Sequence, residues 1–154
     1  MPILDLDRFA QTKLTTAPFK HMVVSDFIIA DQKQAVLRDF PAIDHAGLLP
    51  VEATRPGPSF AALIGELTGP ALTLAVSRKF GIDLTGRPTM VTIRGRAQEK
   101  DGRIHTDSET KLITALLYFN EEWQSQGGRL RLLRAADDLN DIITEVPPSL
   151  GTLV

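Results

Sequence analysis

The helix-forming segments of this sequence all precede its run of short strand-forming segments, and this order limits the fold more than any other feature. Helical patterns lie within residues 1–86, whereas residues 87–154 read as short strands separated by Gly, Asp, Ser and Pro. Parallel βαβ units need helices and strands to alternate, so this order excludes them. The sequence predicts an α+β fold, in which the strands form an antiparallel sandwich or barrel.

In the first half, the predicted elements are bounded by capping and breaking residues. The Pro- and Gly-rich stretch 41–58 is expected to be a loop. Ser59 is expected to be the N-cap of the helix that follows, and Gly81 should end the last helix. The predicted elements are a strand at 21–28, a helix at 30–40, a helix at 60–67 and a helix at 71–80.

The second half contains short apolar runs at regular spacing. The run 111–120 is apolar on both faces, so we expect it to be buried on both sides. In 128–133, the leucines should face inward and the arginines outward. The chain ends on an apolar strand with no turn or charge after it, and such an open edge favours pairing with further strands. The predicted strands are 88–97, 102–107, 111–120, 128–133, 141–146 and 151–154, with the last strands of the fold expected beyond Val154.

Composition excludes several classes of function. The 154 residues suit one domain, and the formal charge of −2 offers no basic surface for nucleic acid. No window approaches the roughly 18 apolar residues of a membrane span, and no secretory leader is visible, so we expect a cytoplasmic protein. The chain has no cysteine, which excludes disulfides, thiolate nucleophiles and Cys-ligated metals.

The triplet His105-Thr106-Asp107 carries the most suggestive chemistry. On a strand, alternate residues share a face, so the imidazole and the carboxylate could bind one metal ion together. This ligand pair suits Fe(II), with a distant second His completing a facial triad. By itself the triplet is a weak signal, because a lone His near a turn is more often solvated or capped.

Two hydroxyl-bearing residues, Thr114 and Tyr118, share a face of the apolar run that follows with Leu116 and Asn120. Buried hydroxyl groups need hydrogen-bond partners, because leaving one unpaired costs roughly 1–3 kcal/mol. Two interpretations of Tyr118 stay open. It is either a core residue whose hydroxyl reaches the surface, or a donor to a ligand carboxylate inside a barrel.

Three linked motifs, IHTDS, LLYFNEEW and GGRLRLL, resemble the central strands of the prolyl 4-hydroxylase-like 2-oxoglutarate/Fe(II)-dependent oxygenases. The resemblance covers residues 87–154 and implies one oxygenase domain over residues 1–154. In that domain, residues 1–86 form a helical support for a double-stranded β-helix, also called a jelly-roll or cupin-like barrel. It further implies hydroxylation of an aliphatic C–H bond, with release of succinate and CO2.

The resemblance also implies roles for individual residues. His105 and Asp107 fall on iron ligands, and Tyr118 falls on the tyrosine that binds the distal carboxylate of 2-oxoglutarate. Thr114 and Leu130 fall on positions that line the cosubstrate pocket. Fe(II) and 2-oxoglutarate are the implied cofactor and cosubstrate, with ascorbate as an optional addition.

Departures from the family pattern are equally informative. The second His ligand and the basic residue that pairs with the cosubstrate are expected beyond Val154, and neither His21 nor His45 matches that ligand. We therefore expect the 154-residue chain alone to be inactive. Arg94 stands where many relatives have Tyr, and we favour a solvated rim position for it over a carboxylate-binding role. The charged stretch 94–103 is either a substrate lid or, more commonly for such loops, a solvated connector.

Two other functions remain open. One is a non-catalytic module of the same fold, used for binding. The other is a cupin-like metal enzyme of another class, which the HxD triplet and Tyr118 disfavour because such enzymes usually present HxH with Glu. For the oxygenase, the substrate would be a small molecule or a peptide, with proline as a first guess, and no nucleic acid or membrane partner is expected.

Overall fold

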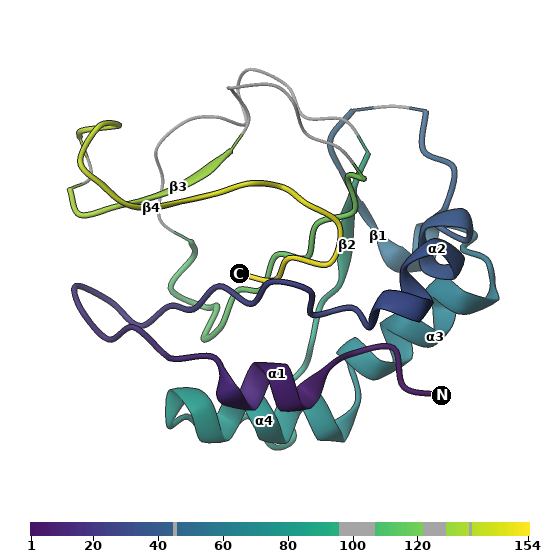
Figure 1. Ribbon diagram of the computed structural model, residues 1–154, viewed down its shortest axis with the longest axis horizontal. Coiled ribbons are helices and arrows are strands. Elements are labelled where there is room, and N and C mark those ends of the chain that lie inside the picture. The colour runs from purple at the N-terminus through teal and green to yellow at the C-terminus, as the bar shows by residue number, and fades with distance from the viewer. Residues whose placement is uncertain (45, 96–106, 122–128, 136) are drawn as a thin grey trace.

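The computed structural model describes residues 1–44, 46–95, 107–121, 129–135 and 137–154. Figure 1 shows helices along one side of the molecule and extended segments across the other. The helices are α1 (Leu6–Gln11), α2 (Ala30–Arg38), α3 (Pro58–Leu67) and α4 (Pro70–Phe80), with a 3-10 turn at Val51–Ala53. The strands are β1 (Leu48–Pro50), β2 (Thr92–Arg94), β3 (Leu130–Leu133) and β4 (Ile142–Val146).

The three predicted helices are confirmed, and one cap prediction is wrong. Helix α4 ends at Gly81, whose φ of 70° is the left-handed conformation that glycine adopts without strain. Helix α3 begins at Pro58 with Gly57 as N-cap, so Ser59 is inside the helix. The carboxylate of Asp39, which follows α2 and is 20 residues earlier in the sequence, accepts the Ser59 N–H at 2.6 Å and so caps α3. Helix α1 was not predicted, because a helix of 6 residues has too few turns to show periodicity.

Two small antiparallel sheets are present among the described residues. Strand β3 pairs with β4, as Leu130 opposite Val146 and Arg131 opposite Glu145, which confirms two predicted strands. Strand β2 pairs with β1, which lies in the stretch predicted as a loop. Pro50 occupies the end of β1, where a missing N–H is tolerated.

Three predicted strands are extended segments joined by isolated bridges. Val24 and Leu117 both pair antiparallel with Leu153, which therefore lies between them. Figure 1 shows the C-terminus near the middle of the molecule for this reason. The chain leaves residue 120, forms the β3–β4 pair, and returns to lie beside its own residues 116–120.

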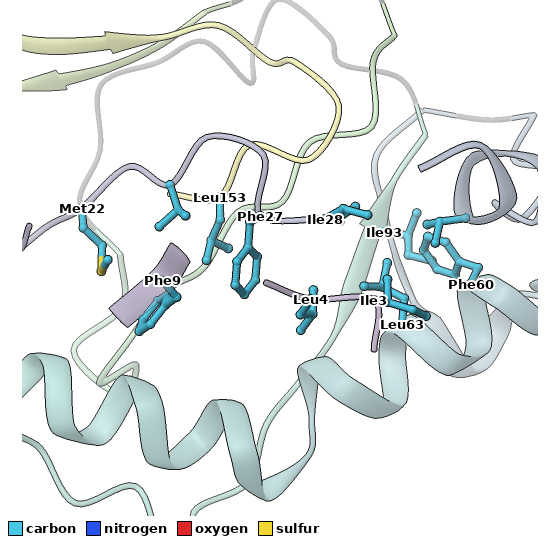
Figure 2. Close-up of a cluster of buried hydrophobic side chains, with 12 residues drawn as sticks. Ile3, Leu4, Phe9, Met22, Phe27, Ile28, Phe60, Leu63, Ile93 and Leu153 are labelled. Carbon is cyan, nitrogen blue, oxygen red and sulfur yellow. The ribbon is translucent and has the colours of Figure 1, made fainter. Parts of the chain in front are cut away.

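The core lies between the helices and these extended segments, as Figure 2 shows. Helix α1 packs on α4, and α3 packs on both α2 and α4. Val24, Phe27, Ile28, Val36 and Leu63 are fully buried. The complete cluster is Ile3, Leu4, Phe9, Met22, Val24, Phe27, Ile28, Val36, Phe60, Leu63, Ile93 and Leu153.

The fold class is mixed helix and strand with small antiparallel sheets, and the described residues form no closed barrel. The expectation that residues 111–120 are buried on both sides is wrong. Leu117 and Phe119 pack against the core, whereas Leu112 and Leu116 are 47% and 41% exposed. The described residues that flank this segment cover only its core side.

Within the described ranges, no helix taken singly is both long and apolar enough to cross a membrane. Helices α3 and α4 reach the required length and composition only as a pair, which is bent by 41°. Phe60 and Leu63 of this pair belong to the core described above.

Candidate functional site

Asp107 and Thr114 lie together at the start of the segment that leads to Tyr118. The Thr114 hydroxyl donates a hydrogen bond to Oδ2 of Asp107. Both residues are exposed. The hydrogen bond holds the carboxylate in one orientation while leaving an oxygen that could bind a cation.

Tyr118 is held by backbone pairing on one side of the same segment. Its N–H donates to the Thr152 carbonyl at 3.0 Å, and its own carbonyl accepts from the Gly151 N–H at 2.9 Å. The side chain is half-buried, and this burial raises the pKa of the phenol above its ordinary value of 10.0. The hydroxyl is therefore protonated at neutral pH and can donate a hydrogen bond.

Thr152 is a polar residue of this face that the sequence did not single out. The Leu117–Leu153 bridge places Thr152 opposite Tyr118, and residues directly opposite in an antiparallel pair point to the same face. Thr152 is 6% exposed and is the one buried polar residue in the described part of the chain. The sequence signal that could have identified Thr152 is its place as a polar residue within the apolar run Gly-Thr-Leu-Val.

Arg94 ends strand β2 and lies within electrostatic range of Tyr118. Its positive charge lowers the pKa of the Tyr118 phenol and so opposes part of the effect of burial. Arg94 is exposed, as a rim position requires. Its proximity to the phenol was not expected from the sequence, in which the two residues are 24 positions apart, from 94 to 118.

Leu130, the remaining predicted pocket residue, lies in the sheet formed by β3 and β4. It is partly buried at the start of β3 and faces Val146 of β4. The alternation predicted for this strand is confirmed, because Arg131 is exposed and Leu132 is partly buried. Arg129 and Arg131 lie 3.7 and 2.9 Å from the carboxylate of Glu145, so these two arginines form ion pairs across the sheet.

Several predicted features lie outside the described residues. These are His105 with its neighbour Thr106, His45, most of the charged stretch 94–103, and the Gly127-Gly128 pair. Within the described ranges, no group of three His, Asp or Glu side chains could hold a metal ion. Of the two predicted iron ligands, the described part of the chain includes only Asp107, which would contribute its carboxylate to an iron site. His105 and a further ligand would have to complete the site.

The surface has two open depressions, and both lie away from these residues. One, of about 460 Å³, is lined by Asp5, Asp7, Arg8, Gln11 and Thr12 along α1. The other, of about 400 Å³, includes the Lys33–Asp26 ion pair and the Gln34–Glu121 hydrogen bond. Neither includes a predicted site residue, and each contains an ion pair, Arg8 with Asp5 in the first and Lys33 with Asp26 in the second.

We take Asp107, Thr114, Tyr118 and Thr152, with Arg94 acting electrostatically on the phenol, as the candidate functional face of the molecule. Its groups are a carboxylate, two hydroxyl-bearing threonines, a protonated phenol and a guanidinium. Such a set could bind a cation at one end and an anion at the other. No family model, curated protein or solved structure matches the chain in the comparisons made.

Proposed function

We propose that this chain belongs to a 2-oxoglutarate- and Fe(II)-dependent oxygenase that hydroxylates an aliphatic C–H bond. The observation that carries the proposal is the placement of Asp107, Thr114 and Tyr118 along one segment. Asp107 and Thr114 are joined by a hydrogen bond, and the Tyr118 phenol is protonated at neutral pH. These residues fall on the ligand and cosubstrate positions that the motif resemblance implies.

The strand connections support a jelly-roll architecture for the proposed enzyme. Residues 116–120 pair with 150–154 after the β3–β4 pair, so the last of these four segments returns beside the first, as the fourth strand of a Greek key does. Jelly rolls are built from two Greek keys. The helices would support one side of such a barrel, with the candidate functional face toward its interior.

Asp107, Thr114 and Tyr118 each have a defined task in this proposal. Asp107, with His105, would bind Fe(II), and Thr114 would orient the Asp107 carboxylate by its hydrogen bond. Tyr118 would donate a hydrogen bond to the distal carboxylate of 2-oxoglutarate, and Leu130 would line the pocket. When bound, Fe(II) would supply the oxidising chemistry together with 2-oxoglutarate and dioxygen, with one oxygen atom of dioxygen entering the hydroxylated substrate and the other entering succinate as CO2 is released.

The test is anaerobic titration of the full-length protein with Fe(II) and 2-oxoglutarate, followed by visible absorption. Chelation of 2-oxoglutarate to iron produces a metal-to-ligand charge-transfer band, which we expect in the wild type. Asp107→Ala should abolish the band. The matched control is Asp137→Ala, which removes an exposed aspartate between β3 and β4 and should leave the band unchanged.

The alternative, a non-catalytic binding module of the same fold, predicts a different result. In that case the full-length wild-type protein gives no band at any ratio of Fe(II) to 2-oxoglutarate. Circular dichroism of each variant would establish that it is folded. An unchanged band in folded Asp107→Ala would contradict the assignment of Asp107 as an iron ligand.

A further inference from the structure

The chain that follows α1 forms a hairpin whose loop, residues 16–20, projects from the molecule. Thr15 and His21 each donate their N–H to the carbonyl of the other at 2.9 Å, which closes the loop. Leu14 packs against the core and Met22 belongs to it, so both ends of the hairpin are anchored. Figure 1 shows this segment extending beyond the ends of α1 and α4. The loop is therefore a protruding tip on a fixed base.

The apex of this tip is apolar. Ala17, Pro18 and Phe19 follow one another in the sequence and are all exposed, and Phe19 is 42% exposed. Nδ1 of His21 donates to the Phe19 carbonyl at 2.9 Å, and the two rings lie 5.0 Å apart between centroids, which restrains Phe19. An exposed run of apolar side chains in a folded protein indicates a contact surface.

The two segments that meet at the base of the tip carry positive charge and contain no acidic residue. Residues 8–25 include Arg8, Lys13 and Lys20, and residues 67–82 include Arg78 and Lys79. The formal charge of the whole chain is −2, so this positive charge is a local feature of the surface.

Lysine contacts hold these segments together. Nζ of Lys79 on α4 donates to the carbonyls of Ala10 and Thr12 at 2.7 and 2.8 Å. Nζ of Lys20 in the tip donates to the Phe80 carbonyl at 2.9 Å. The C-terminal ends of α1 and α4 therefore lie beside the base of the hairpin.

Part of the positive charge at this end has no partner in the protein. The two lysines that bind helix carbonyls offset the negative ends of the helix dipoles. Lys13 and Arg78, by contrast, are exposed and form no ion pair with the residues that the structure describes. Asp83 is the first acidic residue after α4, and it lies beside Arg87, whose Nε donates to the Asp83 carbonyl at 3.2 Å. An apolar apex above unpaired cations is the result.

We propose that this end of the molecule binds the surface of a membrane that contains anionic lipids. In this arrangement, Ala17-Pro18-Phe19 enters the interface, and Lys13 and Arg78 face the headgroups. The boundary between headgroups and acyl chains accepts apolar side chains, and anionic headgroups attract nearby Lys and Arg. A protruding apolar tip suits this deformable partner, whereas a nucleic acid backbone offers it no apolar surroundings.

This contact is independent of the proposed function, and it differs from the expectation, drawn from composition, of no membrane partner. Composition averages charge over the chain, whereas the fold gathers the cations of two distant segments at one end. The contact is peripheral, so it depends on side chains of the tip and its base.

The test is cosedimentation of the 154-residue chain with vesicles of two compositions. One contains phosphatidylcholine alone, and the other contains phosphatidylcholine and phosphatidylglycerol in equal amounts. We expect binding to the mixed vesicles at low ionic strength, and much weaker binding to the neutral ones. Added salt should weaken binding to the mixed vesicles, because it screens the attraction between exposed charges.

Variants of Phe19 test the apolar apex. Phe19→Ala should weaken binding to the mixed vesicles about tenfold, because less apolar surface leaves water. Phe19→Trp should bind at least as tightly as the wild type, because tryptophan favours the membrane interface. Met90→Ala, which shortens an apolar side chain 78% exposed elsewhere on the surface, is the matched control and should bind as the wild type does.

Variants of the cations test the base. Lys13→Gln and Arg78→Gln should each weaken binding to the mixed vesicles about fivefold, because each removes one charge that the anionic surface attracts. Arg55→Gln, at an exposed arginine before α3, is the matched control and should have no effect.

Three results would overturn the proposal. One is no binding of the wild type to the mixed vesicles at low ionic strength. Another is wild-type binding by folded Phe19→Ala, and the third is equal binding to both kinds of vesicle. If instead a single-stranded oligonucleotide or polyglutamate binds in a manner that needs Phe19 and Lys13, and vesicles do not, the surface recognises another polyanion. The charge-transfer test of the proposed function is unaffected by any of these outcomes.

Discussion

The two faces of residues 116–120 have opposite character. On one face, Phe119 stacks against Phe40 and Phe60, with ring centroids 5.3 and 5.5 Å apart, and Leu117 packs on the same core. On the other face, Tyr118 is half-buried and Leu116 is 41% exposed. One short segment thus joins a tightly packed aromatic cluster to an accessible polar surface.

This difference shows that one side of the segment is packed into the core while the other carries polar groups. The aromatic cluster fixes the position of the segment, since edge-to-face and tilted ring pairs pack with specific geometry. The opposite face can then carry donors and a carboxylate without contributing much to the core. Substitutions on the two faces should therefore have different consequences, and the following experiments measure that difference.

The largest effect is expected on the core face. Phe60 is 2% exposed and contacts both Phe40 and Phe119. Phe60→Ala should lower the free energy of unfolding by about 3–5 kcal/mol, through lost burial and the cavity that remains. Urea denaturation followed by circular dichroism measures this. Phe19→Ala, at a ring 42% exposed, is the control and should cost much less.

A smaller effect is expected where a helix holds the N-terminal segment. The Glu66 carboxylate of α3 accepts the N–H groups of Ile3 at 2.9 Å and Leu4 at 2.9 Å. Glu66→Ala leaves these donors without their partner and should cost about 1–3 kcal/mol, measured by the same denaturation. Glu66→Gln keeps one acceptor oxygen and should cost less. Exposed Glu52 serves as control, and a loss as large in Glu52→Ala would contradict the role given to Glu66.

The smallest effect concerns Tyr118 on the polar face and appears only at alkaline pH. Burial raises the pKa of the folded-state phenol above 10.0, so the folded protein keeps a proton that the unfolded chain has released. The stability contributed by this proton is complete below the unfolded pKa and is lost as pH rises through the folded pKa.

Urea midpoints measured from about pH 9 to about pH 11 should therefore fall less steeply in Tyr118→Phe than in the wild type. Arg94→Gln should raise the phenol pKa further, because it removes the charge that lowers it. Identical pH profiles for the wild type and Tyr118→Phe would show that the folded protein does not raise this pKa.

Much of the fold could be predicted from local signals. The helices α2, α3 and α4 follow from apolar runs near Pro and Gly. The strands β3 and β4 follow from short stretches in which apolar and polar residues alternate, with turn residues on either side. The Ser59 cap could not be predicted, because the group that caps α3 is Asp39, 20 residues earlier. The exposure of Leu112 and Leu116 was also missed, since an apolar run does not say which neighbour covers each side.

For the candidate site, the sequence placed Thr114 and Tyr118 on one face, and their spacing was enough for that. It did not show that the charge of Arg94 acts on the Tyr118 phenol, because the two residues lie in segments that are separate in the sequence. Thr152 was missed for a similar reason. Its place opposite Tyr118 depends on the pairing of Leu117 with Leu153.

The sequence by itself determined the segregation of helices and strands and the residue types available for chemistry, because both are properties of the chain read locally. Only the tertiary structure decided which of those residues lie together. The return of residues 150–154 between residues 24 and 117 sets the order of the segments and places Thr152 opposite Tyr118. Contacts between distant segments are chosen by packing of the whole core, and no short stretch of sequence contains that information.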